Sequence, residues 1–302
     1  MTVAGATRPT GASPQAVQHH YDLGNDFFAL WLDPTRTYSC ALWQGDEDLQ
    51  QAQLNKIDWI LDRAGADGVA SLLDVGCGWG ALLRRATERH RAERAVGLSL
   101  SAAQVAWIAA QRWPRLDARL ESWMDHVPDA PYGAIVSVGA FEHFARLDQT
   151  PAQKRAGYRD FFGFCHRVLA PGGRLALQTI IYGNADRSKF SPFFADKVFP
   201  ESDLPHLHEI ESACAGLFEV EALRRDREHY ARTARAWRSA LRARRAEATA
   251  RVGAEQVADY EKYLGLLVVG FHTGSMDLAR LGLRRVDGAG ERHASPSPAP
   301  AP

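Results

Sequence analysis

The chain has few cysteines and no excess of either charge, and each of these features excludes a class of protein. Its four cysteines, Cys40, Cys77, Cys165 and Cys214, form no C-x-x-C pair, which disfavours a metal site or a disulfide scaffold and suits a reducing compartment. Lys and Arg number 36, as do Asp and Glu, so the charge indicates no nucleic-acid partner. No apolar run reaches the roughly 18 residues that span a bilayer, and the first residues lack the apolar core of a signal peptide. We therefore expect a soluble, cytoplasmic protein.

The length and the two ends of the chain suggest how it is organised. Residues 1–14 are small and polar, and residues 288–302 end in ASPSPAPAP. Such segments bury too little apolar surface to offset the entropy lost on ordering, so we expect both ends to be disordered. Residues 15–287 are long enough for one large α/β domain that begins with a helical segment and carries a cap.

Between the ends, short apolar runs alternate with amphipathic stretches. Repeated βα units of this kind predict an α/β fold with a mostly parallel sheet, helices on both faces, and ligands at the carboxyl ends of the strands. The predicted strands are residues 72–75, 95–98, 134–138 and 175–181, and two of the predicted helices are 82–90 and 104–112.

Two irregular segments interrupt this alternation. Pro171, Gly172 and Gly173 are predicted to form a turn between a helix and the last of these strands. From about Tyr182 the alternation stops, and an aromatic segment with prolines follows. We expect a cap or lid insertion around residues 182–251, with a packed surface excursion as the alternative.

The stretch LLDVGCGWG, residues 72–80, runs from an apolar strand into glycines at every second position. Gly76, Gly78 and Gly80 allow a tight turn and a close approach of a ligand to the backbone, and Asp74 can anchor that turn or a polar group of the ligand. The spacing differs from G-x-G-x-x-G, and no Lys-Ser/Thr pair follows it. The loop therefore predicts S-adenosylmethionine rather than a dinucleotide or ATP, although a purely structural turn is the alternative.

Six motifs carry a resemblance to a known family over about residues 17–286. They are HYDLGNDFFALWLDPTRTYSCALW at 20–43, LLDVGCGWG at 72–80, GLSLSAAQ at 97–104, SVGAFEHF at 137–144, FPESDLP at 199–205 and HYARTARAW at 229–237. Through these motifs, which occur in the family's order, the chain resembles the cyclopropane fatty acid synthases and mycolic acid cyclopropane synthases. These enzymes use S-adenosylmethionine and act on alkenes. The resemblance implies a class I methyltransferase fold, which is Rossmann-like, with an α-helical cap.

The second predicted strand runs into Ser99, Leu100 and Ser101, with no acidic residue for the ribose hydroxyls of a cofactor. Gln104 and backbone amides must then supply hydrogen bonds to it. The resemblance implies that Trp123 lies against the adenine and that Tyr38 and Ser39 close over the amino-acid end. With Asp74, the implied cofactor residues are Tyr38, Ser39, Asp74, Gly76, Gly78, Ser99, Leu100, Gln104 and Trp123.

Methyl transfer to an alkene leaves a carbocation, and aromatic faces can stabilise that charge by about 0.5 to 2 kcal/mol each. His143 can orient its neighbour Glu142 or face the cofactor, although a hydrogen-bonded core histidine is the alternative. The candidates for substrate contact and cation stabilisation are Tyr21, Phe141, His143 and Trp237, with Phe28, Tyr38, Phe144 and Tyr230 as further aromatic residues.

Ring closure requires loss of a proton from the added methyl group. The resemblance implies a bound bicarbonate as the base, held by Cys40, Glu142, Tyr230 and the backbone of Ile180. A histidine completes this set in the family, and Gln178 stands in its place here. Glutamine can donate a hydrogen bond but cannot become charged. Two alternatives stay open: bicarbonate binds through the amide, or the proton is lost elsewhere and gives a methyl-branched or methylene product.

These residues predict an S-adenosylmethionine-dependent C-methyltransferase acting on an alkene carbon of an unsaturated acyl or isoprenoid-like substrate, with a cyclopropane as one product. The alternatives are a tailoring C- or N-methyltransferase of a small secondary metabolite and a noncatalytic cofactor- or lipid-binding protein. Residues 224–251 contain ten arginines against three acidic residues, which suits a membrane surface or an acidic carrier protein as partner. A solvated helix face is the alternative explanation for these arginines.

Overall fold

A computed structural model of the protein describes residues 23–185 and 202–288. Its core is a seven-stranded sheet in the order β3-β2-β1-β4-β5-β7-β6, in which the first five strands are parallel and β7 is antiparallel to β5 and β6. The strands are β1 (Leu72–Val75), β2 (Ala95–Ser99), β3 (Leu116–Leu120), β4 (Tyr132–Val138), β5 (Leu169–Tyr182), β6 (Phe218–Arg225) and β7 (Met276–Arg285). The prediction of a mostly parallel α/β sheet is confirmed.

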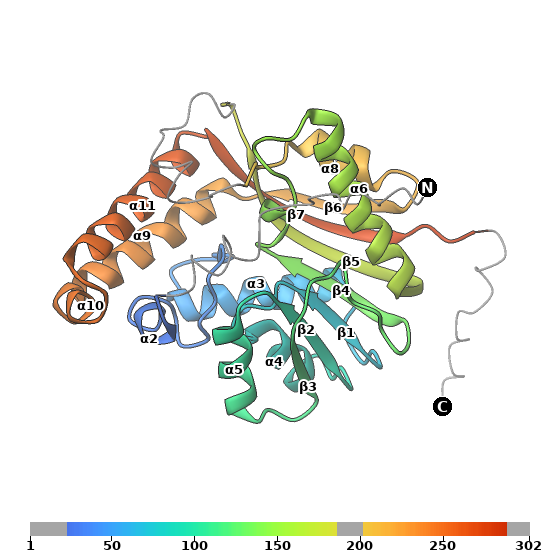
Figure 1. Cartoon of the computed structure of the whole chain (residues 1–302), viewed down its shortest axis with the longest axis horizontal. Helices are drawn as coiled ribbons and strands as arrows, with labels where there is room; N and C mark the ends of the chain where they lie inside the picture. Colours follow the sequence, from blue (N-terminus) through green and yellow to red (C-terminus); the bar gives the residue numbers. More distant parts are fainter. Residues whose placement is uncertain (1–22, 186–201, 289–302) are drawn as a thin grey trace, which may run out of the picture.

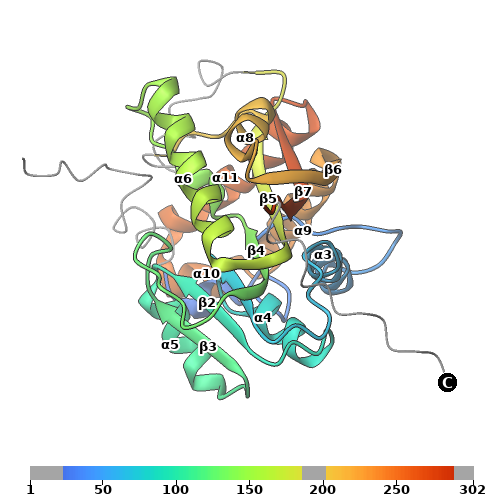
Figure 2. The same ribbon diagram turned by 90° about the vertical axis from the view of Figure 1, so that its right-hand side faces the viewer.

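Helices cover both faces of the sheet (Figures 1 and 2). One face packs against α3 (Leu49–Arg63), α4 (Ala81–Glu88) and α5 (Ala102–Gln111), and the other against α6 (Pro151–Val168) and α8 (Leu207–Cys214). Thr150 begins α6 with a capping box, because its side chain accepts from the Gln153 amide while the Gln153 side chain accepts from the Thr150 amide.

A third layer of helices forms a cap at one side of the sheet, where α9 and α11 lie side by side (Figure 1). It comprises α2 (Asn25–Phe28), α9 (Arg227–Ala243), α10 (Arg245–Val252) and α11 (Ala254–His272). These helices share a core cluster in which Leu241, Leu264 and Leu267 are fully buried. Among the described helices, none combines the length and apolarity needed to cross a membrane.

The cap only partly overlaps the predicted insertion at 182–251. Within that range α8 and β6 belong to the sheet layers, and the cap helices other than α2 run from Arg227 to His272. The alternating sequence of β6 pairs with β7 as an edge strand, whereas the buried side chains of α11 complete the cap. Residues 186–201, which include most of the aromatic segment predicted as a lid, lie outside the described residues.

The predicted turn at Pro171–Gly173 lies within the span of β5 rather than before it. Leu169 pairs with Tyr132, but the next pair joins Arg174 to Ala134, so the intervening residues form an irregularity in the strand. Gly172 adopts a φ of 72°, which a glycine tolerates without strain.

The strands β1 and β4 are neighbours, but the chain leaves them in opposite directions across the sheet, toward β2 and toward β5. Ligands of such sheets bind beyond the carboxyl ends of the strands at this switch point. We therefore expect a ligand site beside the residues that follow β1, β2 and β4.

Candidate active site

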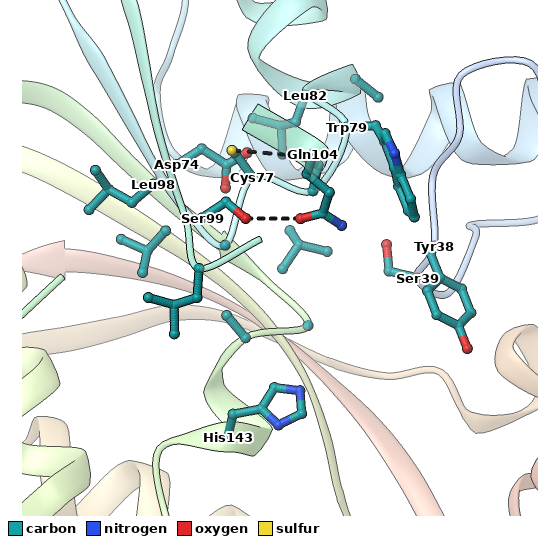
Figure 3. Close-up of a pocket in the computed structure, with 18 of the residues that line it drawn as sticks. Tyr38, Ser39, Asp74, Cys77, Trp79, Leu82, Leu98, Ser99, Gln104 and His143 are labelled. Atoms are coloured by element: carbon teal, nitrogen blue, oxygen red, sulfur yellow. Dashed lines mark hydrogen bonds between the residues drawn. The ribbon is translucent and has the colours of Figure 1, made fainter. Parts of the chain in front are cut away.

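A pocket lies at this switch point, and all nine predicted cofactor residues line it. Figure 3 shows Ser99, Gln104 and Asp74 on one side of the pocket, with Tyr38 and Trp79 on the other. His143 also lines it, together with Lys56 and Arg36, which the sequence did not single out.

The loop after β1 shapes the floor of this pocket. Gly76, Gly78 and Gly80 have φ values of 90°, 54° and 79°. A Cβ on Gly76 would lie 2.6 Å from the Cβ of Ala140, whereas one on Gly78 would meet nothing within 4 Å. Gly78 therefore faces open pocket, and its missing side chain leaves room for a ligand against the backbone.

Asp74 supplies a buried acceptor at the end of β1. Its side chain is almost fully buried, and Oδ1 has no hydrogen-bond partner among the described residues. Burial raises the pKa of this carboxyl to about 7, against the opposing effect of Lys56. A buried oxygen without a partner fits the ammonium end of S-adenosylmethionine, which would supply the missing hydrogen bond.

Ser99 fixes the orientation of Gln104. The Ser99 hydroxyl donates to Oε1 of Gln104 at 2.9 Å and accepts from the amide of Ser101 at 3.1 Å. Because Oε1 is engaged, the amide nitrogen of Gln104 points into the pocket (Figure 3). This pair provides a polar contact at the end of β2, where the sequence has no acidic residue.

Trp79 and Lys56 are pocket residues that the sequence analysis did not identify. The Trp79 indole donates to Oδ1 of Asn25 at 2.8 Å, and this bond ties the glycine loop to α2. The Lys56 ammonium donates to the Ser39 hydroxyl at 2.7 Å, and burial lowers the pKa of Lys56 to about 7. The tryptophan within LLDVGCGWG was a usable signal, whereas the sequence around Lys56 is an ordinary amphipathic helix.

Trp123 and His143 lie on the pocket wall near its boundary with the sheet core. The Trp123 ring lies 5.4 Å from Phe144 and 5.5 Å from Phe161, so it packs in the core as well as lining the pocket. Nδ1 of His143 is 2.8 Å from the Ser202 hydroxyl, and burial lowers the pKa of His143 to about 4. The imidazole is therefore neutral at physiological pH.

Glu142 lies in the short 3₁₀ helix η1 (Phe141–His143) that follows β4. Oε1 of this buried carboxyl accepts a 2.7 Å hydrogen bond from the amide of Ile180, and Oε2 has no hydrogen-bond partner in the described part of the chain. Burial raises the Glu142 pKa to about 7, and the Ile180 hydrogen bond opposes this shift. The Ile180 amide, predicted to contact bicarbonate, thus contacts Glu142 here.

Cys40, Ile180 and Tyr230 belong to the buried cluster that forms the core of the cap. Burial raises the pKa of the Cys40 thiol to about 11, so it remains protonated. Gln178 lies on the same strand as Ile180, and its Nε2 is 3.5 Å from the Cys40 carbonyl. Arg280 of β7, which the sequence analysis missed, donates to Oε1 of Gln178 at 2.7 Å.

The structure separates the predicted aromatic residues into two groups. Trp237 is fully buried in the cap, with its ring 5.3 Å from Tyr38 and 6.1 Å from Tyr230. Phe141 lies in the core between the sheet and α6, stacked on Tyr158 at 4.6 Å, and is not among the pocket residues. Tyr21 lies outside the described residues.

Comparison with known proteins identifies the family. The family model described as mycolic acid cyclopropane synthetase matches residues 10–281. The chain belongs to this family. Cyclopropane mycolic acid synthase 2 of Mycobacterium leprae is 38% identical over 289 residues, covering 88% of this chain and 89% of that protein. Cyclopropane mycolic acid synthase 3 of Mycobacterium tuberculosis is 36% identical over 292 residues, covering 90% of this chain and 94% of that protein.

Solved structures agree with this assignment. The cyclopropane synthase MmaA2 from Mycobacterium tuberculosis superposes with a TM-score of 0.81 at 34% identity, covering 91% of this chain and 99% of that one. The mycolic acid cyclopropane synthase CmaA1, in a complex with SAH and CTAB, gives the same values. The chain is an S-adenosylmethionine-dependent methyltransferase with the class I fold, as the sequence predicted.

Proposed function

We propose that the enzyme transfers the methyl group of S-adenosylmethionine to an alkene carbon of an unsaturated acyl chain and then removes a proton to close a cyclopropane. The observation that carries this proposal is Glu142, a buried carboxyl with one oxygen fixed by Ile180 and the other without a hydrogen-bond partner among the residues that the structure describes. A carboxyl in this environment can act in proton removal, which supports the proposal. The names of the most similar relatives, all cyclopropane mycolic acid synthases, support the same acceptor class.

The bound cofactor supplies an electrophilic methyl group on sulfur. The alkene π electrons form the new C–C bond while the electron pair of the broken S–CH₃ bond stays on sulfur, and the second alkene carbon becomes cationic. Tyr38 lines the cofactor pocket and contacts Trp237, which extends an aromatic surface from the pocket into the cap. We assign stabilisation of the cation to these rings rather than to Phe141, which packs against α6.

Trapping of the cation by a nucleophile must also be avoided. Cys40 is a candidate for such trapping, because it lies in the same buried cluster as Trp237. The thiolate is the reactive form of cysteine, and the raised pKa of about 11 keeps this group as the thiol. Burial of Cys40 thus makes it a weaker nucleophile toward the cation.

In the last step a proton leaves the added methyl group, and the C–H electron pair forms the third side of the ring. Glu142, Tyr230 and the amide of Gln178 would hold a bicarbonate ion, which would supply a base for this proton. The raised pKa of Glu142, about 7, allows it to accept a proton in turn near neutral pH.

A lipid substrate implies access from a membrane or from a carrier protein. Arg242, Arg244 and Arg245 are exposed where α9 meets α10, at the tip of the cap. We propose that this tip contacts anionic headgroups, with each arginine contributing about 1 kcal/mol. Co-sedimentation with anionic and zwitterionic vesicles checks this contact, because a protein that binds both equally has no headgroup site at the tip.

Isotope transfer tests the reaction itself. The enzyme is incubated with vesicles of an unsaturated phospholipid and with S-adenosylmethionine whose methyl group bears three deuterium atoms, and the fatty acids are analysed by mass spectrometry. A cyclopropane retains two deuterium atoms and has no double bond. A methyl-branched alkene that retains three indicates that the proton leaves from the chain instead. No label in any lipid, with label appearing in added small amines or other metabolites, would favour a tailoring methyltransferase.

A further inference from the structure

Arg280 holds a buried positive charge beside Gln178 and Cys40. Its side chain is fully buried on β7, the strand between β5 and β6 (Figure 1). The guanidinium forms an ion pair with Asp226 and donates to Oε1 of Gln178 at 2.7 Å. It also donates to the carbonyls of Ala41 at 2.9 Å and Cys40 at 3.3 Å. One side chain thus joins β5, the loop that contains Cys40, and the residue that precedes α9.

This contact fixes the orientation of the Gln178 carboxamide. Gln178 and Arg280 are directly paired across β5 and β7, so their side chains lie on the same face of the sheet. A guanidinium has only donors, so the atom of Gln178 that faces it must be the oxygen. The NH₂ group therefore lies on the far side of the carboxamide from Arg280.

The NH₂ group of Gln178 retains capacity to bind a ligand. Among the described residues its hydrogen-bond acceptor is the Cys40 carbonyl, at 3.5 Å, which is the long limit for such a bond. The group has two N–H donors, so at least one remains for a ligand. Unlike an imidazole, this donor does not change its protonation state with pH.

The charges around the cluster favour an anion as that ligand. Asp226, the counter-ion of Arg280, also accepts two 3.1 Å hydrogen bonds from Arg224, so one carboxylate serves two guanidinium groups. The neighbouring Cys40 is an uncharged thiol, and both Arg280 and Lys56 exert a positive electrostatic effect on it. A buried cation that shares its counter-ion in this way is stabilised by a further negative charge nearby.

We propose that Arg280 is a positioning residue that holds the amide of Gln178 as a permanent hydrogen-bond donor to a small oxyanion of the bicarbonate class. The guanidinium acts through Gln178 and through the positive field that it contributes, since its own donors are directed at protein acceptors. This inference rests on the proposed function, in which such an anion receives the proton from the added methyl group.

Direct binding of the anion tests the inference separately from turnover. ¹³C-labelled bicarbonate is titrated with the protein saturated in S-adenosylhomocysteine, and the line width of its NMR signal reports binding. Gln178→Glu keeps an acceptor for Arg280 but replaces the donor by an oxygen, so we expect binding to be lost. Arg280→Lys keeps the charge but not the fixed fork of donors, and we expect the Kd for bicarbonate to rise about tenfold.

Two comparisons separate this role from a merely structural one. Gln178→His offers an acceptor nitrogen to Arg280 and a donor on the other side, so it should recover bicarbonate binding relative to Gln178→Glu. Arg284→Lys makes the same chemical change on the same strand at a side chain that pairs with Glu219 and Glu221 outside the site, and it should bind bicarbonate as the parent enzyme does. Calorimetry should give an unchanged affinity for S-adenosylhomocysteine in all four variants.

The inference is overturned if the parent enzyme binds no bicarbonate, or if Gln178→Glu and Arg280→Lys bind it as tightly as Arg284→Lys does. It is also overturned if bicarbonate and S-adenosylhomocysteine affinities fall together, because a general loss of structure then explains both. Absence of methyl transfer to alkenes in an enzyme that binds bicarbonate through Gln178 would instead refute the proposed function and retain the anion site.

Discussion

The amide nitrogen of Ile180 on β5 lies 2.7 Å from Oε1 of Glu142 on η1. A backbone donor cannot rotate away, so this bond holds the carboxyl in one orientation beside Ile180, which belongs to the same buried cluster as Cys40 and Tyr230. The second oxygen, Oε2, is left for the reaction. Rigid placement of this kind is what a base system needs to act at a defined proton.

Glu142→Gln should therefore lower turnover by about a hundredfold while cofactor binding persists, since the amide oxygen can still accept from Ile180 but the group no longer takes up a proton. Transfer of labelled methyl groups and calorimetry with S-adenosylhomocysteine measure the two effects. The matched control is Glu209→Gln. Glu209 is also a buried carboxylate, but it pairs with Lys154 and does not line the pocket. Equal turnover in the two variants would remove Glu142 from the reaction.

The same carboxyl predicts a pH-dependent stability. Burial raises the Glu142 pKa from 4.5 to about 7, so the folded state binds more protons than the unfolded state between these values. The free energy of unfolding therefore decreases as pH rises through this window, by about 3 kcal/mol from this group alone. Glu142→Gln removes the effect and should become more stable relative to the parent enzyme between about pH 5 and pH 8. Urea unfolding of both proteins at the two pH values measures this change. If the free energies of unfolding of the variant and the parent enzyme differ by the same amount at both pH values, the prediction is wrong.

Gly78→Val should abolish cofactor binding in a folded protein. The added side chain would enter open pocket at a residue with a φ of 54°, so it competes with the ligand and adds backbone strain. Gly68→Val controls for the strain, because Gly68 has a φ of 69° and an equally open Cβ position at an exposed turn outside the pocket. Calorimetry with S-adenosylmethionine should distinguish them, and undiminished binding to the Gly78 variant would show that the cofactor lies elsewhere.

Gln104→Ala should raise the Kd for S-adenosylmethionine about tenfold, the effect of losing one well-oriented hydrogen bond. Ser99→Ala should have a smaller effect in the same direction, because the amide remains but is no longer held by the Ser99 hydroxyl. Gln111→Ala, at the exposed end of the same helix, is the control. An affinity for Gln104→Ala equal to that control would mean that the amide makes no contact with the cofactor.

The cofactor half of the site could be predicted from sequence because its residues occur in short motifs at strand ends. The loop at 72–80 and the segment at 97–104 each follow an apolar strand, and the fold brings both to one pocket. The third strand on that side, β3, was not predicted, because its side chains are only partly buried and its sequence LDARL has no continuous apolar run.

The catalytic half was less accessible to sequence analysis because its parts meet only through long-range pairing. The segment Met276–Arg285 contains four charged residues, a composition typical of an exposed segment, yet nearly all of it is buried. Only the antiparallel register between β5 and β7 places Arg280 beside Gln178. The contact that orients the Gln178 carboxamide therefore could not be inferred from the sequence.

The position of β7 in the chain also has a consequence for synthesis on the ribosome. The pocket-lining residues all precede position 145, whereas the strand that separates β5 from β6 follows every other element. A nascent chain that ends before Met276 leaves the edge of β5 open and lacks Arg280. The residues of the cofactor pocket are thus synthesised before the residue that orients Gln178, and β5 gains its second neighbour only with the last strand that the structure describes.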